Sequence, residues 1–371
     1  MKKIDNFQKG MGIGGWLTNY KRFTVLKKEW RMPITVGDME HFATYITAWD
    51  AENIKNMGMD HVRIGFDQIV MEYYDKPYCY REETFGYLEN FVNECEKRGL
   101  RVVLNMHKAI GNYCDISEDV SLFDSEELQK RFIALWVEME RRYADHPDVV
   151  FELLNEVRDI NPELWNKLAR KTVKAIREIN PNRYIIVGTT CWNSHARLPD
   201  LYVWQDDDRV IYTFHVYGPF EFTHQRGLLQ KENHYYNRVM PYPATTKEDM
   251  ERYDGFARLI RNDENAKAYP GVEAINYEWI KTQLEPARQF TLDNPDKILW
   301  LGEFGTIRHC PIEYRENYMR DLIRFAKEND MPYCVWNYLS TPYDGNRFSL
   351  VDDDNRKIVS EEMLKIINGQ I

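Results

Sequence analysis

Two glutamates stand at the ends of apolar runs in this sequence. One run is Val149–Glu156, which ends in Glu156, and the other begins at Ile298 and ends in Glu303. An ionised carboxylate in apolar surroundings is costly unless it is paired or neutralised. Each glutamate alone is equally well explained as half of a buried salt bridge. Two of them at the ends of two strands favour a functional pair.

Paired carboxyl groups facing one site suit the cleavage of an acetal. One stays protonated and donates to the leaving oxygen, while the other is ionised and attacks the anomeric carbon or activates water. Glu156, which follows Asn155, suits the acid. Glu303 suits the nucleophile if a cation keeps it ionised, and Arg63 is the candidate cation. An ordinary interior ion pair is the alternative for Arg63.

Three further side chains stand near the ends of apolar runs. Trp336 offers a flat face on which the C–H groups of a sugar ring can pack, although a lone tryptophan is as often part of a core. His107 and His215 could hold a metal, but they fit better as polar wall residues of a site for an organic substrate. We therefore expect neither a metal nor a cofactor.

Several other chemistries lack their motifs. Residues 10–15 satisfy GxGxxG, but a polar segment precedes them and no helix pattern follows, so they predict a glycine-rich first strand and not a dinucleotide site. The sequence has no GxSxG elbow, P-loop or HExxH. Its six cysteines form no CxxC pair, which leaves zinc-knuckle and thioredoxin-type sites without support.

Eight apolar runs predict eight strands. Most are nearly continuous, as in parallel strands that are covered on both faces, and eight is the number that closes a (β/α)8 barrel. We therefore predict an α/β protein with a TIM-barrel fold and a single catalytic domain over residues 1–371. The runs are Met11–Leu17, His61–Phe66, Arg101–His107, Val149–Glu156, Tyr184–Thr190, Val210–Tyr217, Ile298–Glu303 and Tyr333–Tyr338.

Helical patterns alternate with these runs, which is typical of parallel βαβ units. They cover Glu82–Arg98, Ser125–Tyr143, Asn161–Ile179, Tyr277–Leu292, Glu313–Glu328 and Ser360–Ile367. About eighty residues separate the sixth and seventh runs. Within them, residues 220–275 are polar and rich in aromatic residues, and they predict a small subdomain inserted after the sixth strand.

The composition excludes several classes of protein. The 371 residues carry 49 Lys and Arg against 59 Asp and Glu, a net charge of −10, and no basic stripe suits a nucleic acid. No apolar run reaches the ~18 residues of a membrane span. The N-terminus has no apolar signal segment, so we expect a cytoplasmic protein; a secreted protein whose signal has been removed is the alternative. We expect a monomer.

Seven blocks along the chain resemble glycoside hydrolase family 5, and within it the clostridial endoglucanases. The blocks are GIGGWLTNY (12–20), DHVRIGFD (60–67), NMHKAIG (105–111), FELLNEV (151–157), YTFHVYGPFEFTHQ (212–225), GEFG (302–305) and VWNY (335–338). Short motifs such as Asn-Glu are weak alone, but seven blocks in the same order are specific. The resemblance implies a (β/α)8 barrel, an inserted subdomain after the sixth strand and double displacement with retention.

The resemblance also implies roles for individual residues. Glu156 matches the acid/base and Glu303 the nucleophile. The other matches are Asn155 and His107 as partners of the sugar at the cleavage site, Arg63 and Tyr217 beside the nucleophile, His215 beside the acid/base, and Trp336 stacked under the sugar. Family members often have Asp-Met-His-His where this chain has Asn-Met-His-Lys at 105–108. We expect Lys108 to change the charge of the cleft wall. The segment after Trp336 also departs from the family.

These expectations converge on a retaining hydrolase of β-glucan, an endo-β-1,4-glucanase or mixed-linkage β-glucanase without a metal. Retention requires the two carboxyl groups to lie ~5–5.5 Å apart, whereas inversion through water requires ~6.5–9.5 Å. A β-mannanase or an exo-β-1,3-glucanase on the same barrel is the alternative, since fold does not settle substrate. A non-catalytic carbohydrate-binding barrel is a third possibility, which the pair of glutamates argues against.

Overall fold

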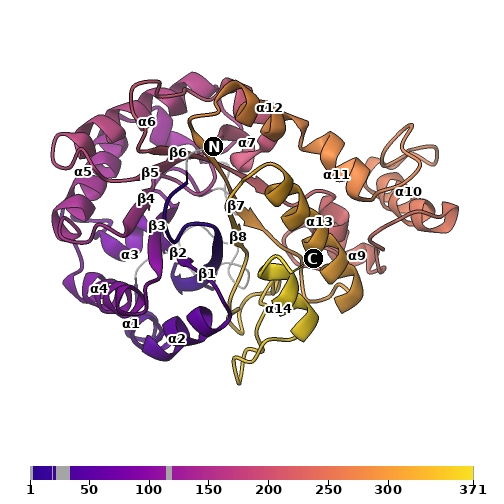
Figure 1. The fold of residues 1–371 in the computed structure, drawn as a ribbon, viewed down its shortest axis with the longest axis horizontal. Coiled ribbons are helices and arrows are strands. Elements are labelled where there is room, and N and C mark those ends of the chain that lie inside the picture. Colours follow the sequence, from indigo (N-terminus) through magenta and orange to yellow (C-terminus); the bar gives the residue numbers. More distant parts are fainter. Residues whose placement is uncertain (1–2, 19, 22–33, 114–118, 371) are drawn as a thin grey trace.

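Eight parallel strands close into a barrel in the computed structural model, which describes residues 3–18, 20–21, 34–113 and 119–370 (Figure 1). Each strand pairs with the next along the chain, and β8 pairs with β1. The predicted TIM barrel is therefore confirmed. The strands are β1 Lys9–Leu17, β2 His61–Asp67, β3 Arg101–Lys108, β4 Val149–Glu152, β5 Ile185–Val187, β6 Val210–Val216, β7 Ile298–Phe304 and β8 Tyr333–Val335.

Alternate strand residues build a layer of apolar side chains inside the barrel. Its members are Val103, Val150, Ile186, Ile211, Trp300 and Cys334, joined by Phe7 of the N-terminal segment. The Phe7 ring stacks on His61 at 4.6 Å and lies 5.4 Å from Trp300, so aromatic rings fill the barrel near the amino ends of the strands. This packed layer leaves the carboxyl ends of the strands as the place for polar chemistry.

Helices surround the barrel (Figure 1). The predicted helices at residues 82, 125, 161, 313 and 360 are present as α4 Glu82–Lys97, α5 Glu126–Arg142, α6 Pro162–Arg177, α13 Ile312–Glu328 and α14 Glu361–Ile367. The predicted helix Tyr277–Leu292 is wrong as a single element. It consists of α11 Tyr277–Gln283 and α12 Glu285–Asp293, because Pro286 has no N–H to donate and its ring crowds the preceding turn.

Two helices after β1 were not predicted. They are α1 Val36–Thr44 and α2 Ala48–Asn56, and a capping box opens each of them, Thr35 with Asp38 and Thr47 with Asp50. Shorter helical turns connect the elements before β6: α3 Gln68–Met71, α7 Thr190–Asn193, and the 3-10 turns Ser121–Phe123 and His195–Asp200. Asn19 of the resemblance block 12–20 and Cys114 lie outside the described residues.

The segment between β6 and α11 contains three helices, α8 Phe220–Thr223, α9 Lys231–Tyr236 and α10 Lys247–Arg261. Backbone hydrogen bonds between Ala244 and Ile275 join the chain before α10 to the chain after it. The helix α10 extends away from the barrel (Figure 1). That residues 220–275 form a subdomain of their own stays a prediction. Among the described residues, none of the helices has the length and apolar character needed to cross a membrane.

Candidate active site

A cavity of about 570 Å³ lies at the carboxyl ends of the strands. Seven of the eight side chains proposed from the sequence line it, namely His107, Asn155, Glu156, His215, Tyr217, Glu303 and Trp336. The eighth, Arg63, is fully buried beneath the cavity and contacts Glu303 and Asn155. The structure thus brings all eight together. Their roles are taken up under the proposed function.

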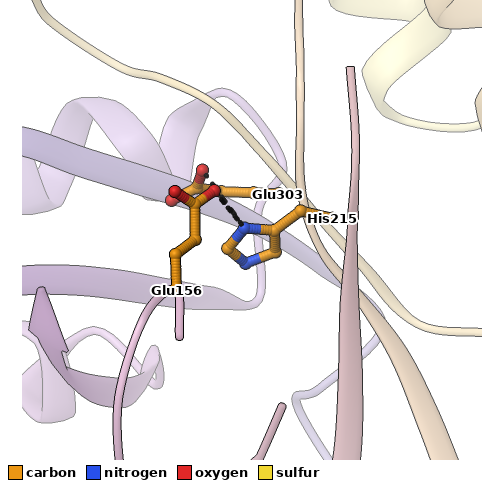
Figure 2. A group of neighbouring side chains, drawn as sticks. All are labelled: Glu156, His215 and Glu303. Carbon is orange, nitrogen blue, oxygen red and sulfur yellow. Dashed lines mark hydrogen bonds and ion pairs between the residues drawn. The ribbon is translucent and has the colours of Figure 1, made fainter. Parts of the chain in front are cut away.

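Glu156, His215 and Glu303 point toward one another across the cavity (Figure 2). One carboxyl oxygen from each glutamate and one ring nitrogen of the histidine lie within 4.8 Å of each other. His215 Nδ1 lies 3.0 Å from Glu156 Oε1 and 3.6 Å from Glu303 Oε2. This short separation is closer to the ~5–5.5 Å between the carboxyl groups of a retaining site than to the ~6.5–9.5 Å of an inverting one.

Glu303 sits on β7 with only 4% of its surface exposed. Arg63 Nη1 donates to Oε1 at 2.5 Å, and the Tyr217 hydroxyl donates to Oε2 at 3.0 Å. Burial would raise the pKa of Glu303, but the charges of His215 and Arg63 and these two hydrogen bonds outweigh it and lower that pKa below the usual range. Glu303 is therefore held as an anion.

Arg63 is held by a second carboxylate that the sequence interpretation missed. Its Nε and Nη2 atoms donate to the two oxygens of Glu152 at 2.6 and 2.9 Å, and Nη2 also donates to Asn155 Oδ1 at 2.6 Å. Burial alone would lower the pKa of Arg63, but Glu152 and Glu303 raise it. A charged residue inside the apolar run of β4 needs a buried counter-ion, and this requirement could have identified Glu152 as the partner of Arg63.

Glu156 does not lie in a strand, contrary to the prediction. Strand β4 ends at Glu152, and Asn155 N–H donates to Met106 O of β3 at 2.9 Å as the chain turns into the cavity. The Glu156 side chain is partly exposed, and its carboxyl group contacts His215. Glu156 is thus more open to solvent than Glu303.

Trp336 lies one residue beyond β8, where its N–H donates to Phe304 O at 2.9 Å. Its ring is parallel to that of His107, with centroids 5.5 Å apart and planes 7° apart. A Cβ atom on Gly12 or Gly14 would lie 2.7 or 2.6 Å from the Trp336 ring. The glycines of the GxGxxG match belong to β1, as predicted. Of these, Gly12 makes room for this tryptophan together with its neighbour Gly14.

Lys108 was expected at the wall of the cleft, but it is buried at the end of β3, in register with Asp67 of β2. It does not line the cavity. The substitution therefore places its charge inside the structure and not in the path of a ligand.

Among the described residues, Glu156, His215 and Glu303 form the set whose donor atoms could share a metal ion. The Arg63 guanidinium already occupies one oxygen of Glu303, and its fixed positive charge opposes a cation at that position. The donor set fits a metal poorly for this reason.

Two facing carboxyl groups at the mouth of a (β/α)8 barrel are the arrangement that a glycoside hydrolase uses. The family model "Cellulase (glycosyl hydrolase family 5)" matches residues 31–341. Endoglucanase C of Acetivibrio thermocellus is 33% identical over 365 residues, which cover 98% of both proteins. The chain belongs to glycosyl hydrolase family 5. Cellodextrinase A of Ruminococcus flavefaciens is 34% identical over 230 residues, covering 61% of this chain and 62% of that protein.

Solved structures share the barrel. Cel5A of Thermotoga maritima in complex with cellobiose superposes with a TM-score of 0.71 at 24% identity and covers 97% of both chains. Cellulose synthase subunit Z of Clostridioides difficile gives a TM-score of 0.71 at 20% identity, over 97% of this chain and 99% of the other. At these identities the likeness establishes the fold.

Proposed function

We propose that the protein is a retaining endo-β-1,4-glucanase that uses Glu303 as nucleophile and Glu156 as acid/base. The observation that carries the proposal is the pair itself, two carboxyl groups within 4.8 Å of which Glu303 is buried against a guanidinium and a phenol. The alternative of a non-catalytic binding barrel does not account for a buried anion aimed into an open cavity next to a second acid.

The reaction proceeds in two displacements. Glu156 gives its proton to the glycosidic oxygen as a Glu303 oxygen bonds to the anomeric carbon, and the bond to the leaving sugar breaks. A water then enters, Glu156 takes one of its protons, and the resulting hydroxide displaces Glu303 from the same carbon. Two inversions at one carbon give net retention.

The neighbouring residues support these steps. Arg63 and Tyr217 keep Glu303 ionised and fix its orientation. His215 contacts both carboxyl groups and so fixes their positions relative to each other. Trp336 and His107 lie side by side at the cavity, where a sugar ring at the cleavage site can stack on the tryptophan and hydrogen-bond to the histidine. Asn155 is oriented by its hydrogen bond from Arg63.

The proposed substrate is a β-glucan chain. The names of the relatives support it, since Endoglucanase C aligns over nearly the whole chain. A product-resolved digest of cello-oligosaccharides, lichenan, laminarin and mannan tests it. We expect internal cleavage of the β-1,4-linked and mixed-linkage glucans. Exclusive release of monosaccharide from laminarin, or preferential cleavage of mannan, would reassign the substrate, and no sugar release from any of the four would refute the enzyme.

A further inference from the structure

His224 is a buried histidine at the cavity in addition to His107 and His215, and the mechanism above does not use it. It follows α8 on the segment after β6, lines the cavity and is 6% exposed. Its ring stacks on Phe220 at 3.9 Å and 11°, and it meets the rings of Tyr217 and Phe348 at 5.3 and 5.0 Å. Three aromatic neighbours therefore fix the plane of the imidazole.

The hydrogen bonds of Thr223 determine which nitrogen of His224 carries the proton. The Thr223 hydroxyl has one hydrogen, and it donates that hydrogen to Tyr217 O at 2.6 Å. The same oxygen lies 3.0 Å from His224 Nδ1 and can only accept there. Nδ1 therefore carries the hydrogen, and Nε2 carries the lone pair of a neutral ring.

The ring stays neutral in its surroundings. Burial lowers the pKa of His224 to about 3, so the imidazole is uncharged at neutral and mildly acidic pH. Within the described part of the chain, Nε2 has no hydrogen-bond partner. With Nδ1 turned to Thr223 and the ring packed among aromatics, the edge left toward the cavity is the one that carries Nε2.

We infer that His224 Nε2 accepts a hydrogen bond from a hydroxyl of the sugar chain bound beside the cleavage site, which makes His224 a substrate-binding residue that selects an unsubstituted hydroxyl. The inference rests on the proposed function. A sugar without that hydroxyl, or with an alkyl group on it, leaves the acceptor unpaired and is discriminated against. The Tyr217 ring that packs against His224 also carries the hydroxyl that donates to Glu303, so Tyr217 connects this histidine to the nucleophile.

Two matched variants of His224 test the contributions of Nδ1 and Nε2 separately. His224→Asn keeps a nitrogen near the position of Nδ1 and removes the acceptor at the cavity edge. His224→Gln places an amide oxygen near the position of Nε2 and gives up the contact with Thr223. We expect His224→Asn to lower kcat/KM on cellotetraose about five- to tenfold, as the loss of one neutral hydrogen bond would, and His224→Gln to recover much of that loss.

The decisive experiment combines these variants with monodeoxy analogues of cellotetraose. For one analogue, wild-type kcat/KM should fall about five- to tenfold, and His224→Asn should show no further loss, because the same hydrogen bond is already gone. Losses that add for every analogue would overturn the inference. So would a uniform loss on all substrates with a shifted acidic limb of the pH profile, which would indicate a structural role through Tyr217. A wild-type protein that cleaves no cello-oligosaccharide would instead refute the proposed function.

Discussion

The two catalytic candidates occupy unlike surroundings although both lie near the carboxyl ends of apolar strands. Glu303 lies within β7, buried, with Arg63 and Tyr217 donating to its two oxygens. Glu156 lies four residues past the end of β4, partly exposed, with His215 as its contact. Under the proposed mechanism, this difference would prepare two identical side chains for opposite tasks. Fixed donors hold an anion on one side, and on the other a turn of chain leaves an acid able to exchange its proton with water.

The largest effect should come from Glu303→Gln, which removes the nucleophile and keeps the shape of the side chain. We expect kcat on cellotetraose to fall by about 10⁴-fold or more. Binding of cellotetraose, measured by calorimetry, should stay within a few-fold of the wild type, because the sugar contacts remain. A variant with wild-type turnover would remove Glu303 from this role.

Glu156→Ala tests the other side of the comparison. Loss of a general acid should lower kcat/KM on cellotetraose by ~10²–10⁴-fold. The loss should be much smaller on an aryl glycoside with an activated leaving group, since that group departs without protonation. Equal losses on both substrates would contradict the assignment of Glu156 as the acid.

Glu152→Gln tests whether the buried charges beneath Glu303 contribute to both stability and catalysis. Breaking a buried ion pair by removing one partner should lower the free energy of unfolding by ~3 kcal/mol, measured by urea denaturation. It should also lower kcat. Without the Glu152 carboxylate, Arg63 is held less firmly, and the Glu303 carboxylate then has a less fixed cation beside it.

A matched control exists elsewhere in the barrel. Glu140 makes a bidentate pair with Arg183, and both residues are buried. Arg183 also donates to Val149 O, so this pair lies at the amino end of β4, opposite the end that carries the cavity. Glu140→Gln should cause a similar loss of stability with kcat unchanged. If both variants lower kcat to the same degree at a temperature where both are folded, the effect of Glu152 is one that any broken buried ion pair would cause. It would then not come from the charge near Glu303.

Tyr217→Phe should give the smallest effect. It removes one of the hydrogen bonds that lower the pKa of Glu303, so that pKa rises toward the ordinary value. The nucleophile works above its pKa, so the acidic limb of the kcat/KM profile should move to higher pH. A limb that stays in place, or moves to lower pH, would show that the phenol does not tune Glu303.

Much of the barrel could be predicted from the sequence because parallel strands covered on both faces leave long apolar runs. The residue at which each strand ends could not be predicted from these runs. Glu156 lies beyond β4 since the chain turns where Asn155 bonds to β3, and apolar pattern does not record that turn. The helices α1 and α2 were missed although their capping boxes are visible, and the break at Pro286 was overlooked inside a continuous pattern.

The site could be predicted in part for a similar reason. Glu156 and Glu303 stand out because a charge at the end of an apolar strand is costly. Glu152 was not recognised as the partner of Arg63, since pairing across strands depends on register and on which residues face inward. The place of His224 depends on aromatic neighbours just after β6 and in the connection after β8, and such packing has no local signature in the sequence.

The stereochemistry of the first product tests the central claim most directly. Proton NMR of a fresh digest of cellotetraose, recorded before mutarotation, distinguishes the two anomers at the newly formed reducing end. We expect the β-anomer to appear first, because two displacements at one carbon retain its configuration. Initial release of the α-anomer would mean a single displacement by water, and it would contradict Glu303 as nucleophile.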